Sequence, residues 1–122
     1  ASPELVEQRA IDERIDSVFY SDEYAAAIVR NTNGEYGSRL EVYKKDGTHV
    51  LSKEFNFEYT NADLDGDLII LYNEDSCRIY NMSGTEKLDA AFDFPVSKIR
   101  KGRFPGTLVV TGPQQMRELK LR

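Results

Sequence analysis

Short apolar runs separated by polar turns follow this chain from about residue 15 to its end. Apolar stretches of about four to eight residues, alternating or continuous and bounded by Gly, Asp, Asn or Ser, are typical of β-strands. The run over residues 68–71 is apolar throughout, which indicates a strand buried on both faces. The pattern predicts strands over residues 15–20, 24–30, 39–44, 49–55, 59–64, 67–72, 77–81, 86–92, 96–100, 107–111 and 116–121.

One segment of the chain recurs after 37 residues: LEVYKKDGTHVLSKEF over 40–55 and CRIYNMSGTEKLDAAF over 77–92. The identical pairs are Tyr43 with Tyr80, Gly47 with Gly84, Thr48 with Thr85, Leu51 with Leu88 and Phe55 with Phe92. A repeat of this length built from short strands is typical of β-propeller blades. The recurring Tyr and Phe positions favour packing between units.

The strands group into three tandem units, near residues 15–56, 57–93 and 94–122. The predicted fold is all-β, with four-stranded antiparallel units forming a partial β-propeller of about three blades. Residues 1–14 are predicted to be a short N-terminal helix or linker, because Ser2 suits an N-cap and Pro3 the first helical turn.

Three blades are too few to close a ring, since propellers typically have about four to eight. Three arrangements remain open on this basis. The chain is the C-terminal part of a larger propeller, it forms an open array, or two chains pair as a homodimer to make a larger ring.

Composition narrows the classes of function. The net charge of −5 argues against a nucleic-acid-binding surface. The single cysteine, Cys77, excludes an internal disulfide, and the single histidine, His49, excludes a His-based metal cage within one chain. No apolar run approaches the roughly 20 residues needed to cross a bilayer.

An acidic segment offers a candidate cation site. Asn61, Asp63 and Asp65, followed by Gly66, match the first half of an EF-hand-type calcium loop. The twelfth position, where such a loop places a bidentate Glu, is Tyr72. Calcium is therefore the one cofactor that the sequence suggests. The alternative interpretation of this segment is a β-turn whose carboxylates are solvated.

Other segments offer candidate contacts with a partner. The loop over 31–38 is an insertion relative to the second unit, and its side chains Asn31, Asn33, Glu35 and Tyr36 are the predicted ligand or partner contacts. The run over 97–103 carries four positive charges and could bind an anion, although a solvated strand and turn is the alternative. Cys77 is predicted to be a small buried apolar residue.

The run LIILYNEDSCRIY over 68–80, the Ser83-Gly84 turn, and the strands over 107–111 and 117–121 resemble one family. It is an uncharacterised, propeller-like "domain of unknown function" family of Gram-positive bacteria, and the resemblance covers about residues 15–122. More loosely, the units resemble WD40-like and quinoprotein-like blades, without the Gly-His and Trp-Asp signatures of the former. The resemblance implies an extracytoplasmic, cell-surface β-repeat region, held at the membrane through an N-terminal anchor that this sequence does not contain.

The function expected from these observations is a non-catalytic cell-surface binding or scaffold module for a protein or a cell-wall polymer. One alternative is a fragment of a hydrolase that uses a carboxylate pair, such as Asp63 with Asp65 or Glu74 with Asp75. A second alternative is a structural module that completes a propeller ring by dimerisation.

Overall fold

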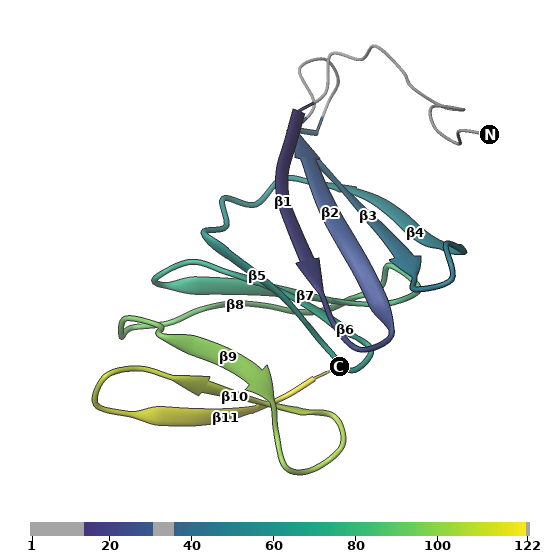
Figure 1. The fold of residues 1–122 in the computed structure, drawn as a ribbon. Coiled ribbons are helices and arrows are strands. Elements are labelled where there is room, and N and C mark those ends of the chain that lie inside the picture. Colours follow the sequence, from purple (N-terminus) through teal and green to yellow (C-terminus); the bar gives the residue numbers. More distant parts are fainter. Residues whose placement is uncertain (1–13, 31–35, 122) are drawn as a thin grey trace, which may run out of the picture.

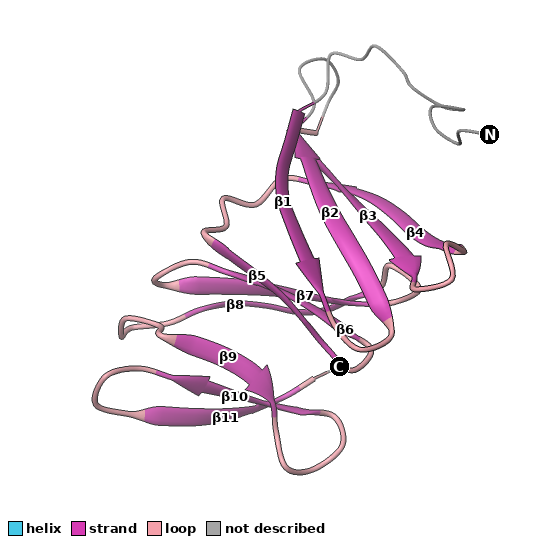
Figure 2. Cartoon of the chain, viewed as in Figure 1, coloured by secondary structure: helices cyan, strands magenta, loops and turns pink. Residues whose placement is uncertain are grey.

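The computed structural model describes residues 14–30 and 36–121 (Figure 1). The predicted helix over residues 1–14 lies outside this part of the chain, except for Arg14, which begins the first strand. In the described ranges every regular element is a β-strand (Figure 2), and no helix there has the length and hydrophobicity needed to cross a bilayer. The all-β prediction is therefore confirmed.

Three antiparallel sheets follow one another along the chain, each built from consecutive strands. The first contains β1 (Arg14–Tyr20), β2 (Tyr24–Arg30), β3 (Ser38–Lys44) and β4 (His49–Phe55). The second contains β5 (Asn61–Asp65), β6 (Leu68–Tyr72), β7 (Ser76–Asn81) and β8 (Glu86–Ala91). The third has three strands, β9 (Lys98–Lys101), β10 (Thr107–Thr111) and β11 (Met116–Lys120). The described chain thus contains two four-stranded sheets and one three-stranded sheet stacked in sequence order (Figure 1).

The sequence repeat is also a repeat of strand register. Val42 pairs with Leu51 across β3 and β4, and Ile79 pairs with Leu88, its counterpart 37 residues on, across β7 and β8. Both pairs are followed by a register shift, and both hairpins turn through a glycine with positive φ, Gly47 and Gly84. Because L-residues with side chains rarely adopt positive φ, glycine is needed at both turns.

Two hydrophobic cores separate the three sheets. The first core lies between the first two sheets, where Ile28 and Leu40 meet Ile69 and Leu71. The second core lies between the second and third sheets, where Ile70 and Ile79 meet Leu108 and other apolar side chains. Strand side chains alternate between the two faces of a sheet, so successive residues of β6 enter different cores. All five residues of β6 are buried, as its continuous apolar run predicted.

The recurring aromatic residues do not all pack between sheets. Phe55 and Tyr80 do, with 2% of each exposed and their rings 6.4 Å apart. Tyr43 is 42% exposed and makes an edge contact with His49. It lies on the side of the first sheet against which no other described sheet packs. The prediction of inter-unit packing was therefore wrong for Tyr43.

Candidate functional site

An open pocket lies on the face of the third sheet that points away from the second. Leu108 and Val110 of β10 are fully buried against the second sheet, so the alternation of the strand turns Val109 to the opposite side. Val109 pairs with Arg100 of β9 and with Glu118 of β11, which places these three side chains in one row. The pocket has a volume of about 580 Å³ and is lined by Arg100, Lys101, Gly102, Arg103, Phe104, Val109, Met116 and Glu118.

Positive charge dominates the rim of this pocket. Lys101 is engaged with the second sheet, because its Nζ lies 3.6 Å from Asp67 and its backbone N–H donates to Asp65 at 2.8 Å. Within the described ranges, Arg100 and Arg103 have no carboxylate partner. Guanidinium groups present planar sets of N–H donors that bind carboxylates and phosphates. Two arginines on this rim are therefore available to an anionic group from outside the described chain.

The same pocket also has an apolar component. The side chain of Phe104 is 59% exposed and that of Met116 is 68% exposed, although both are large apolar groups. Methionine is common at surfaces that adapt to different partners, and exposed aromatic rings add contact area at low entropic cost. The arrangement suits a ligand that combines negative charge with apolar groups.

The residues of the predicted calcium site lie on one strand, β5, and are engaged in other contacts. Asp63 accepts a hydrogen bond from Lys98 Nζ at 3.0 Å, and Asp65 accepts the one from the Lys101 backbone. Asn61 donates to Thr60 Oγ1 at 3.3 Å. The described residues contain no group of three or more His, Cys, Asp or Glu side chains placed to hold a metal ion. The calcium site stays a prediction, and the structure gives its two carboxylates the role of joining the second sheet to the third.

Of the predicted partner contacts in the loop, three, Asn31, Asn33 and Glu35, lie outside the described residues. Tyr36 is described and is 40% exposed. The structure therefore leaves the prediction for this loop untested.

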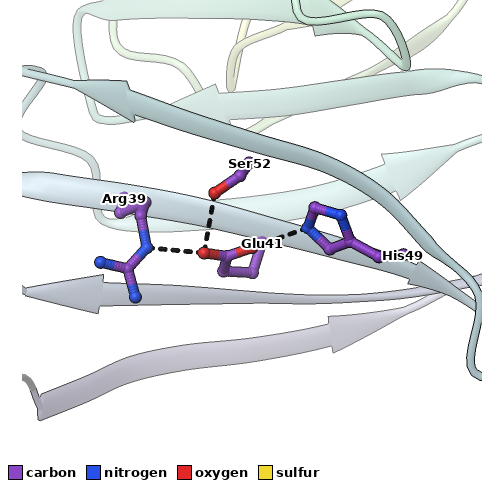
Figure 3. A network of polar contacts seen from close by, with 4 residues as sticks. All are labelled: Arg39, Glu41, His49 and Ser52. Atoms are coloured by element: carbon purple, nitrogen blue, oxygen red, sulfur yellow. Dashed lines mark hydrogen bonds and ion pairs between the residues drawn. The ribbon is translucent and has the colours of Figure 1, made fainter.

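A hydrogen-bonded network occupies the open face of the first sheet (Figure 3). Glu41 accepts from Arg39 Nε at 2.6 Å and from Ser52 Oγ at 2.8 Å, and His49 Nε2 lies 3.0 Å from its other oxygen. Partial burial of Glu41 raises the pKa of its carboxyl, but the hydrogen bonds from His49, Ser52 and Arg39 outweigh burial and lower it. A carboxylate held ionised by three donors acts as a structural anchor between β3 and β4.

A second polar cluster joins the first two sheets near β1. The hydroxyl of Tyr59 donates to Asp16 at 2.5 Å and lies 2.9 Å from Ser17 Oγ. Burial and the bond to Asp16 raise the pKa of Tyr59 to about 12, so the phenol stays protonated and keeps donating at neutral pH. Ser17 and Asp16 belong to β1, and Tyr59 precedes β5, so the cluster fixes the approach of these two strands.

Neither Cys77 nor the carboxylates of the hydrolase alternative form a catalytic pair in the described part of the chain. Cys77 is buried as predicted, and burial raises the pKa of its thiol to about 11, so little of the nucleophilic thiolate forms at neutral pH. None of the described Asp and Glu residues is buried, so no carboxylate is buried beside another, and Glu74 and Asp75 are exposed. The hydrolase alternative therefore has no supporting pair among these residues.

Sequence reasoning found only part of the pocket on the third sheet. The basic run over 97–103 and Phe104 were visible as a candidate anion site. Val109, Met116 and Glu118 were not, because they come from two other strands. The signal that could have found them is the alternation of side chains between the two faces of strands 107–111 and 116–121. Once these strands are paired with 96–100, the residues that share a face with Arg100 can be identified.

The sheets also define a class of fold. The solved structure of HIRA residues 644–1017 is similar to this chain with a TM-score of 0.60 and 12% sequence identity, over 97% of this chain and 39% of that one. This likeness, at low identity, supports a propeller-like, WD40-like arrangement of the three sheets. The chain spans well under half of that neighbour.

The family is shown by a match to the whole described chain. Residues 1–121 match the model of a family of unknown function (DUF5711), and the chain belongs to this family. A search of the curated proteins found no match.

Proposed function

We propose that this chain is a non-catalytic binding module whose partner is a protein segment that is both acidic and apolar. The observation that carries the proposal is the pocket on the third sheet, where Arg100 and Arg103, which pair with no carboxylate of the described residues, lie beside exposed Phe104 and Met116. The propeller-like fold is compatible with a binding or scaffold role. The proposed setting is extracytoplasmic, which rests on the sequence resemblance alone.

Charge and surface chemistry together favour a protein over an anionic wall polymer. A polymer of repeating phosphates would need cations along its length, whereas Phe104, Val109 and Met116 line this pocket beside its cations. A peptide supplies both groups within a few residues, because carboxylate and apolar side chains can follow one another. The negative net charge of the chain outside the pocket would also repel a long polyanion.

The test uses a fluorescently labelled peptide that alternates glutamate and leucine, and follows its anisotropy on titration with the intact chain. We expect saturable binding that weakens at least about 30-fold in a variant carrying Arg100→Ser and Arg103→Ser, since each of the two lost charge-assisted hydrogen bonds is worth roughly 1 kcal/mol or more. Lys44→Ser is the control, because Lys44 is exposed at the end of β3, away from the pocket.

Three results would contradict the proposal. The first is an affinity of the double arginine variant equal to that of the unmodified chain. The second is an affinity independent of salt, because exposed charge pairs are screened at high ionic strength. The third is complete displacement of the peptide by a polyglycerol phosphate at equal charge concentration, which would favour an anionic polymer.

A further inference from the structure

We draw no further inference here: the strongest candidate, the pocket of about 300 Å³ between the β6–β7 turn and the segment that leads into β9, gathers the acidic side chains Glu74, Asp75 and Asp93 beside Phe92 and Phe94, and nothing in the described part of the chain shows which ligand would occupy it.

Discussion

At the scale of single residues, the repeat conserves geometry while it inverts charge. Glu41 and Arg78 are 37 residues apart and hold the same place on β3 and β7. Arg78 bridges Glu86 and Asp89 on the fourth strand of its sheet, and Glu41 bridges His49 and Ser52 on the fourth strand of its own. The same three positions are in contact in both sheets, and only the sign of the charge at the central position differs between them.

The first prediction concerns Glu41. Replacing Glu41 with Gln removes the anion that accepts hydrogen bonds from Arg39, Ser52 and His49, and should lower the free energy of unfolding by about 1–2 kcal/mol at neutral pH. The pKa of Glu41 is lowered in the folded state, so its stabilising effect is present above its unfolded pKa and is lost as the pH falls through the folded value. Urea unfolding of both chains from neutral pH to pH 3 should show the difference shrinking below about pH 4.5.

Glu23→Gln is the control for this measurement, because Glu23 is exposed in the turn between β1 and β2, away from Glu41. It should change stability by less than about 0.5 kcal/mol. A Glu41→Gln effect that grows on acidification would contradict the assignment of an ionised, hydrogen-bonded carboxylate.

At the scale of elements, the two hairpin glycines make the next prediction. Gly47 and Gly84 have φ of 94° and 86°. Alanine at either position would strain the backbone and should lower the free energy of unfolding by about 1 kcal/mol. A Cβ at Gly47 would meet nothing within 4 Å, whereas a Cβ at Gly84 would lie 3.0 Å from Leu51 Cδ1 in the first sheet. Urea midpoints should therefore fall further for Gly84→Ala than for Gly47→Ala. Equal losses would mean that the Leu51 methyl group moves aside without cost.

The strands were predictable from the sequence because their signals are local. The alternation of apolar residues and the Gly-containing turns are visible within about ten residues, and the apolar run over 68–71 correctly indicated β6 as buried on both faces. The fate of Tyr43 was not predictable, because an identical residue at an identical repeat position is buried in the second sheet as Tyr80. Whether another sheet packs against a given face depends on the position of the sheet in the array. The sequence of the strand alone does not contain this information.

The candidate site was predictable only in part, for a similar reason. The cations of the pocket are adjacent in sequence, so the run over 97–103 was visible. Whether each cation has an acidic partner depends on the second sheet, where Asp63 pairs with Lys98 and Asp67 with Lys101, while no carboxylate among residues 14–30 and 36–121 pairs with Arg100. Such pairing between sheets cannot be read from the composition of one strand.

At the scale of the whole molecule, the second sheet is shared by both cores. Ile69 and Leu71 pack toward the first sheet while Ile70 and Ile79 pack toward the third. Unfolding of either outer sheet would expose one face of the second, and unfolding of the second would destroy both cores. The stability of the array should therefore be highest at its centre.

Hydrogen exchange provides the measurement of this gradient. We expect the backbone amides of β6 and β7 to exchange most slowly, close to the rate set by global unfolding, and those of β11 to exchange fastest among the strands. Amides of β11 as protected as those of β6 would contradict a gradient of stability that falls from the second sheet to the third. Protection confined to the first sheet would contradict a shared central sheet.

The contact between Arg78 and the linker before its own sheet has a consequence for the order of the units. Arg78 donates to the carbonyl oxygen of Asn56 at 2.9 Å and stacks on Phe57, so the second unit recognises the segment that joins it to the first. Glu41 stands at this position in the first unit and could only repel a carbonyl oxygen placed there. The first two units are consequently not interchangeable, because they carry opposite charges at this equivalent position and only Arg78 can donate to the linker.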